Sequence, residues 1–172
     1  LELYDPIQNK WTLLPDMPEK LQYSGSAVDK DDLLVSGGLN HSVGGCSNEV
    51  YRLSHSKKEW IHEKAMCLPD RRFGHASLVT ADGNLWVFGG NIAMVCNEDI
   101  PEERYEVYNP SDSVLYFDRT LGDSGEWHEC AAMGATRIWL SVFDVDGYLY
   151  AVGGDADRFG KVHLPTIERY DR

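Results

Sequence analysis

The stretch LWVFGG, residues Leu85–Gly90, is a short apolar run that ends in two glycines, and the chain repeats this pattern twice more. The other copies are LLVSGG at Leu33–Gly38 and LYAVGG at Leu149–Gly154. Each glycine pair is followed by a strand-like segment with a tyrosine, and the first two tyrosines by a tryptophan: Tyr51, Tyr116 and Tyr170, then Trp60 and Trp127. Such an ordered recurrence is an internal repeat, which determines the fold before any single residue does.

Four short strands fit each repeat, and we name them a to d in chain order. Strand a of the second repeat, His75–Thr80, precedes the turn ADGN, where Asp-Gly is a strong hairpin signal. Strand b ends in the glycine pair, strand c carries the tyrosine and strand d carries the tryptophan. Antiparallel meanders repeated around an axis form a β-propeller, and the large aromatics are expected to fill the space between its blades.

The order of glycine pair, tyrosine and tryptophan resembles the kelch repeat, and the closest copy is LPDRRFGHASLVTADGNLWVFGG at Leu68–Gly90. This copy has the family's proline before an arginine, the histidine at the strand start and the acidic-glycine turn. The resemblance, most similar to the kelch domains of BTB-kelch proteins, implies an all-β, kelch-type β-propeller. Similar proteins usually have six blades. The chain is therefore predicted to be a partial propeller of about three four-stranded antiparallel blades, half of such a ring.

The predicted organisation is a single partial propeller over residues 1–172. Its parts are strands c and d of a preceding blade at 1–14, one blade at 20–62, a second at 72–129 and an incomplete blade at 136–172. Because the chain starts at Leu1 rather than at a methionine and holds half a ring, we expect a piece of a longer polypeptide. Pairing of two chains as half-rings is the alternative.

Charge and composition exclude several classes of partner. The formal net charge of −12 opposes nucleic acid and anionic membranes, so neither is predicted as a partner. No apolar run approaches the roughly 20 residues of a membrane span. The four cysteines form no C-x-x-C pair and are predicted to be free thiols in a reducing compartment. The predicted location is the cytoplasm, with a cytoskeletal or nuclear location also open.

No metal site and no cofactor are predicted. The segment IHEK at Ile61–Lys64 lacks the second histidine of H-E-x-x-H. The glycine pairs end strands without a following helix, so they do not form phosphate-binding loops.

Strand alternation places the b–c loops and the d–a connections on one face of a propeller. The b–c segment of the second repeat, Asn91–Ser113, is long and acidic, with Arg104 as its one base. A long loop in a compact domain is usually functional or disordered. This one is either a solvated insert or an acidic lip that selects basic peptides, with Tyr105 and Tyr108 as aromatic anchors.

The kelch resemblance implies that arginines and polar groups on this face line a central mouth. The candidate partner-binding residues are Lys20, Tyr23, Arg71, Arg72, His75, Tyr105, Tyr108, Arg137 and Trp139. Counting from the glycine pairs places Lys20 and Thr136 level with Arg72, and Tyr23 and Trp139 level with His75; a slip of one residue would align Arg137 with Arg72. Arg72 either contacts a partner or braces a neighbouring loop, and His75 is expected to be structural more often than catalytic.

The sequence therefore predicts a protein–protein recognition module. The resemblance implies the substrate-binding kelch domain of a BTB-kelch adaptor for a cullin-based ubiquitin ligase, although nothing in these residues forms a BTB domain. An actin- or cytoskeleton-binding kelch protein is the alternative. Some kelch-type propellers are oxidases or isomerases, but no catalytic constellation is recognisable here, and the chain is predicted not to be an enzyme.

Overall fold

The computed structural model describes residues 1–40, 45–96, 105–121, 124–157 and 159–172, with the side chains of 94–96 and 105–107 also left out of the description. The described part is built almost entirely of antiparallel strands, plus one 3-10 turn, η1 (Lys64–Met66). In this part no helix is long and apolar enough to cross a membrane. The all-β prediction is confirmed.

The strands form a series of antiparallel sheets in chain order. A first pair, β1 (Glu2–Asp5) and β2 (Lys10–Leu13), holds Tyr4 and Trp11 as strands c and d. The first four-stranded sheet consists of β3 (Gly25–Asp29), β4 (Asp32–Asn40), β5 (Gly45–Ser54) and β6 (Glu59–His62). The second consists of β8 (Ala76–Val79), β9 (Leu85–Phe88), β12 (Val114–Asp118) and β13 (Glu126–Glu129). The third has β14 (Ser141–Val145), β15 (Tyr148–Val152) and β16 (Ile167–Asp171).

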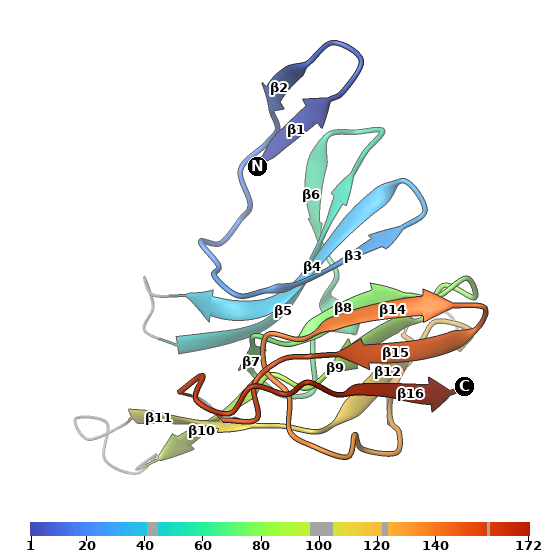
Figure 1. Ribbon diagram of the computed structural model, residues 1–172. Coiled ribbons are helices and arrows are strands. Elements are labelled where there is room, and N and C mark those ends of the chain that lie inside the picture. The colour runs from blue at the N-terminus through green and yellow to red at the C-terminus, as the bar shows by residue number, and fades with distance from the viewer. Residues whose placement is uncertain (41–44, 97–104, 122–123, 158) are drawn as a thin grey trace.

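The three larger sheets are arranged as blades of a partial propeller (Figure 1). Strand a of each blade packs beside strand a of the next, so that β8 lies between β3 and β14. The β1–β2 hairpin stands away from the other sheets, at the blue end of the chain (Figure 1). The predicted positions of the glycine pairs, tyrosines and tryptophans on strands b, c and d are confirmed.

The long b–c segment of the second blade differs from the predicted loop. Residues Asn91–Cys96 form β10 and Tyr105–Pro110 form β11, and the two strands pair as an antiparallel hairpin. A short strand, β7 (Arg72–Phe73), pairs with the start of β10 and makes a three-stranded sheet. The apolar run IAMVC and the tyrosines and valine of YEVYNP favour strands here, but the surrounding acids had suggested a loop.

The apolar core lies between the blades, as a propeller requires. Ala27, Leu34 and Val50 of the first blade pack with Leu85, Val87, Leu115 and Phe117 of the second. A second cluster joins Trp86, Phe88 and Val114 to Leu140, Leu149 and Ala151 of the third blade. The aromatic strand residues take part unequally: Trp127 packs against the first cluster, Trp60 is half-buried and Trp11 is 61% exposed.

The glycine pairs allow neighbouring blades to approach closely. Gly89 has a φ of +61°, and a Cβ there would lie 2.2 Å from the carbonyl oxygen of Arg137 in the next blade. Gly37, at φ +55°, meets the carbonyl oxygen of Arg72 in the same way, at 2.6 Å. Any side chain at these positions would be strained and would push two blades apart.

Tryptophan N–H groups add a repeated link between blades. Trp127 donates from Nε1 to the carbonyl oxygen of Cys67, 2.8 Å away, in the connection that precedes its blade. Trp60 donates equivalently to the carbonyl oxygen of Pro15 at 3.0 Å. Trp60 and Trp127 of strands d thus each bind the backbone that follows the preceding blade.

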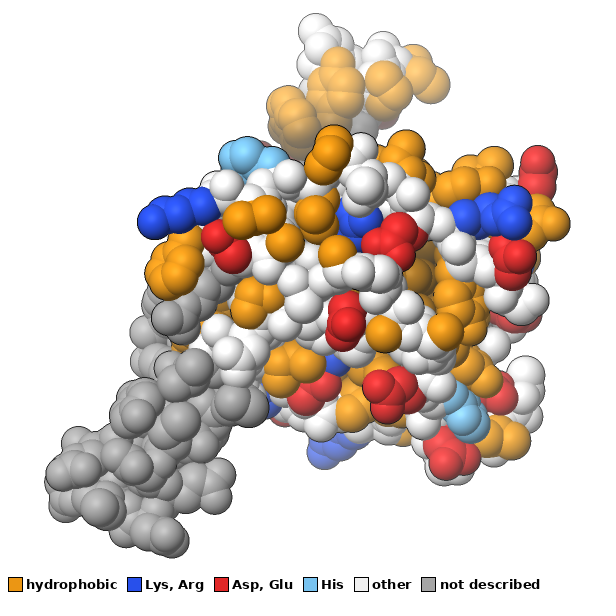
Figure 2. Space-filling view, turned by 60° about the horizontal axis from the view of Figure 1, so that its bottom comes forward, with side chains coloured by type: hydrophobic (Ala, Val, Ile, Leu, Met, Phe, Trp, Pro, Cys, Tyr) orange, Lys and Arg blue, Asp and Glu red, His pale blue; other side chains and the backbone are white. Residues whose placement is uncertain are grey.

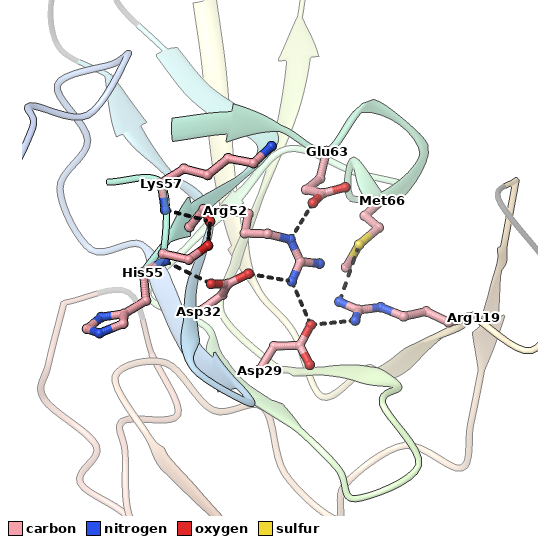
Figure 3. A network of polar contacts seen from close by, with 10 residues as sticks. Asp29, Asp32, Arg52, His55, Lys57, Glu63, Met66 and Arg119 are labelled. Carbon is pink, nitrogen blue, oxygen red and sulfur yellow. Dashed lines mark hydrogen bonds and ion pairs between the residues drawn. The ribbon is translucent and has the colours of Figure 1, made fainter. Parts of the chain in front are cut away.

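An ion-pair network also joins the first two blades (Figure 3). The carboxylate of Asp29, which is buried at the end of β3, accepts hydrogen bonds from Arg52 of β5 at 2.8 Å and from Arg119 of the second blade at 2.6 Å. Burial alone would raise the pKa of Asp29, but the bonds from Arg119 and Arg52 hold it below its usual value. The network is therefore a charged brace between blades rather than an open site.

Candidate functional site

Two of the predicted mouth arginines are structural braces. Arg72 is fully buried, with its guanidinium bonded to both oxygens of Asp70 at 2.6 Å and to the carbonyl oxygen of Gly89 at 2.9 Å. Arg137 is also fully buried, and it bonds to the carbonyl oxygen of Gly153 at 2.5 Å and to Glu168 at 2.8 Å. A guanidinium with no exposed surface cannot contact a partner, so both arginines leave the candidate set, and the bracing interpretation of Arg72 is preferred.

These contacts also correct the alignment of the repeats. Arg137, rather than Thr136, is the counterpart of Arg72, because each guanidinium reaches the first glycine carbonyl of its own blade. Tyr23 and Trp139 are level with Gly74, not with His75, because backbone hydrogen bonds join the three in series. Counting back two residues places Leu21, not Lys20, at the arginine position of the first blade.

His75 is buried between the first two blades. Its Nε2 lies 3.0 Å from the hydroxyl of Ser36, and a Cβ on Gly25 would clash with the same imidazole at 2.4 Å. Burial, with a smaller effect of the nearby Arg72 charge, lowers the pKa of His75 to about 3. The imidazole is neutral and inaccessible, so His75 also leaves the set of partner contacts and takes the structural role.

The buried neutral His75 predicts a loss of stability on mild acidification. In the unfolded chain the imidazole takes up a proton near its ordinary pKa, about 6.5, whereas in the folded chain it does not. Stability is therefore complete above that value and falls as the pH drops below it, by about 2 kcal/mol at roughly pH 5. Urea unfolding between about pH 7.5 and 5 measures this loss. His75→Gln should flatten the profile and the exposed-site control His55→Gln should not; an unchanged slope in His75→Gln would contradict the assignment.

Tyr23 and Trp139 are exposed just before the strands a of the first and third blades. The amide of Gly74 donates to the carbonyl oxygen of Tyr23, and the amide of Trp139 donates to that of Gly74, both at 2.7 Å. The ring centroids of Tyr23 and Trp139 are 6.2 Å apart, and those of Tyr23 and Phe73 are 6.3 Å apart. Tyr108 of β11 meets Phe73 edge-on at 5.1 Å. We call these four side chains the aromatic row: Trp139, Tyr23, Phe73 and Tyr108.

The backbone of the row is strained in a way that turns do not explain. Tyr23 and Trp139 both have a φ of +56°, in the left-handed region that bulky residues rarely adopt. The other described non-glycine residues with positive φ lie in the hairpin turns: Asn9, Lys30, Lys58 and Asp146. Gly74, which is level with them in the second blade, has a φ of +65°, so all three blades share this left-handed conformation before strand a. The side chains of Tyr23 and Trp139 are 56% and 45% exposed.

The other predicted site residues lie around the row or outside the description. Lys20 is exposed, and Arg71 is half-buried, with its carbonyl oxygen accepting the Ala93 amide at 2.7 Å. Tyr105 begins β11, but its side chain lies outside the described part. The proposed acidic lip, including Glu98, Asp99, Glu102 and Glu103, falls mostly on residues outside the description. Phe73 was missed by sequence reasoning, although it directly precedes the glycine that aligns with Tyr23 and Trp139.

Charge does not concentrate on the face drawn in Figure 2, where basic and acidic side chains are scattered among apolar and neutral atoms. The formal net charge of −12 is thus not gathered into one acidic field there.

Comparison with known proteins matches the repeats and the fold. No protein-family model matches the chain. Curated relatives include Spermatocyte protein spe-26 of Caenorhabditis elegans, 25% identical over 99% of this chain and 27% of its own length. Kelch-like protein 23 of Homo sapiens is 25% identical over 99% of this chain and 26% of its own, and Beta-scruin of Limulus polyphemus is 29% identical over 98% and 17%. The solved structure of YjhT superposes with a TM-score of 0.74 at 15% identity, over 99% of this chain and 48% of that one.

The chain is similar to kelch-like proteins along nearly its whole length. The glycine pairs, tyrosines and tryptophans occupy the strands that a kelch blade requires. The chain spans about a quarter or less of the length of these curated relatives and about half of the YjhT chain.

The structural comparison overturns the prediction that this chain is not an enzyme. That prediction treated the scaffold as one for binding, but the fold is the same propeller as in YjhT. Kelch-type propellers include enzymes, and a fold of this kind hosts many functions. The prediction was wrong because it excluded enzymatic activity on the ground of the propeller fold and the lack of a recognisable catalytic motif. Neither observation excludes catalysis.

Proposed function

We propose that the chain is a protein-recognition module that binds an apolar or aromatic peptide segment on the aromatic row. The observation that carries the proposal is the pair Tyr23 and Trp139, both exposed and both held in left-handed backbone conformation. Tyrosine and tryptophan dominate the energetics of protein interfaces. The buried Phe73 ring lies 6.3 Å from the Tyr23 ring, and the Tyr23 ring lies 6.2 Å from that of Trp139, so these side chains lose little conformational freedom on binding.

Trp139→Ala is expected to weaken peptide binding about 10- to 30-fold, as loss of an interface hot spot does. The probe is a random peptide display library selected on the wild-type protein, followed by fluorescence anisotropy of the enriched peptides. Trp11→Ala is the matched control, because Trp11 is 61% exposed on the distant β1–β2 hairpin. Selection of no peptide, or binding that survives Trp139→Ala, would contradict the proposal.

We also propose that the complete protein uses this module as the substrate-binding part of a BTB-kelch adaptor for a cullin-based ubiquitin ligase, in the cytoplasm. The similarity to proteins named kelch-like supports this role. Cys67 and Cys130 are free thiols, which fits a reducing compartment. A cullin should co-purify with the full-length protein and be retained by Trp139→Ala, because recruitment would lie outside these residues. Absence of a cullin would refute the adaptor role while leaving peptide recognition intact.

A further inference from the structure

Three potential metal ligands converge on the outer strands of the first blade. The side chains of Glu49, His62 and Cys67 each offer a ligand atom, and these atoms lie within 4.8 Å of one another. The Cys67 Sγ lies 3.2 Å from Glu49 Oε2 and 3.7 Å from His62 Nε2, while His62 Nε2 and Glu49 Oε2 are in direct contact. Within the described residues, this is the one such cluster of three.

The backbone fixes all three ligands before any ion arrives. Glu49 lies on β5 and His62 lies on β6, where it is paired with Tyr51 and its ring is 5.1 Å from the tyrosine ring. Cys67 follows η1, and the Trp127 indole of the next blade donates to its carbonyl oxygen at 2.8 Å.

The segment that carries Cys67 is also tied to β5 on both sides of Glu49. The amide of Glu63 donates to the carbonyl oxygen of Val50, and the amide of Leu68 donates to that of Asn48, each at 2.8 Å. The Asn48 side chain returns a bond to Leu68 at 3.1 Å. These bonds fix the backbone of Cys67 relative to β5 and so bring its side chain close to that of Glu49.

The ligand chemistry selects the metal. One thiolate, one imidazole and one carboxylate suit Zn²⁺, with bond lengths of about 2.3 Å to sulfur and about 2.0 Å to nitrogen and oxygen. Tetrahedral bonds of these lengths separate sulfur from nitrogen by roughly 3.5 Å, close to the observed 3.7 Å. The Glu49 carboxylate must turn away from His62 to admit the ion. Glu49 and His62 are 32% and 35% exposed, which gives the carboxylate that room and leaves a fourth position to water.

A second carboxylate lies close to the cluster. Glu19 accepts a hydrogen bond from the Tyr51 hydroxyl at 2.6 Å, and the Tyr51 ring lies 5.1 Å from the His62 ring. A bound divalent ion would neutralise the Glu49 carboxylate and displace the proton of the Cys67 thiol, which donates to Glu49 at 3.2 Å.

We propose that Glu49, His62 and Cys67 form a zinc site with water as the fourth ligand. Glu49 and His62 are 13 residues apart in the sequence, and His62 and Cys67 are 5 apart. These spacings match no metal-binding motif, which is why the sequence alone predicted no metal site. The second blade supplies a comparison: Tyr116 pairs with His128 as Tyr51 pairs with His62, but Val114 stands where the first blade has Glu49.

The test is a titration of the purified chain with Zn²⁺ alone, and with Co²⁺ as a spectroscopic substitute, at about pH 7.5. We expect one equivalent of metal, a thiolate-to-cobalt charge-transfer band, and release of about one proton per ion. Cys67→Ser and His62→Gln should each weaken binding by at least about 10-fold. The matched controls His128→Gln and Cys130→Ser, from the second blade, should bind as wild type does.

Three results would overturn the site: no stoichiometric binding, a cobalt spectrum without a thiolate band, or equal losses in the second-blade controls. If Cys67→Ser does not fold, Glu49→Gln tests the site instead, because it removes a ligand from a half-exposed position with little change in side-chain shape. Wild-type affinity in Glu49→Gln would equally refute the three-ligand site. None of these readouts depends on peptide binding, so the site and the proposed function can fail separately.

Discussion

Arg72→Ala is expected to lower the free energy of unfolding by about 3–5 kcal/mol, as removal of one partner from a buried ion pair does. The guanidinium is fully buried, and its loss leaves the Asp70 carboxylate and the Gly89 carbonyl without their donor. Urea unfolding followed by tryptophan fluorescence measures the change.

Lys20→Ala is the control for Arg72, because Lys20 is an exposed cation in the connection before the preceding blade. Its effect should stay within about 0.5 kcal/mol. A wild-type unfolding midpoint for Arg72→Ala, combined with weaker peptide binding, would restore Arg72 to the partner contacts and remove the bracing role.

Trp86→Ala is expected to cost a similar amount, about 3–5 kcal/mol, because it empties a large buried site. Trp86 is 5% exposed, and its ring stacks at 4.8 Å on Tyr116 of its own blade and lies 5.6 Å from Tyr170 of the third. Its Nε1 donates to the Thr80 hydroxyl at 3.2 Å. Urea unfolding at a constant denaturant slope measures the loss. The exposed Trp11 is the matched control, and equal effects of Trp86→Ala and Trp11→Ala would contradict the interblade core.

Most of the fold could be predicted from the repeat, because each of the sequence signals in it has a local physical cause. Asp-Gly turns, glycine pairs and spaced aromatics fix strand order without knowledge of distant contacts. The segment after Gly90 was predicted to be a loop because of its acidic residues, although the apolar run IAMVC at its start is typical of a strand, and that run forms most of β10.

The candidate site was only partly predictable, because the type of a residue does not reveal whether its side chain is buried in the fold. From residue type alone, Arg72 and Arg137 would be expected to bind an anionic partner. Their buried guanidinium groups instead form hydrogen bonds within the chain. Tyr23 and Trp139 were found because the glycine spacing placed them together, even though their alignment was one residue off. The convergence of Glu49, His62 and Cys67 needed the pairing of β5 with β6 and the path of the segment after η1.

The hydrogen bonds and ion pairs described between blades join neighbours: Trp127 to Cys67, Asp29 to Arg119, His75 to Ser36 and Trp139 to Gly74. The contact between the Tyr23 and Trp139 rings, by contrast, joins the first blade to the third. Stability in such an array is a sum of single-blade terms and nearest-neighbour interfaces, with little coupling at longer range. Away from that ring contact, the energetic effects of substitutions in the first and third blades should therefore add, whereas those on either side of one interface should not. The molecule can loosen one blade, and with it one part of the mouth, while the next blade but one keeps its amides protected from exchange.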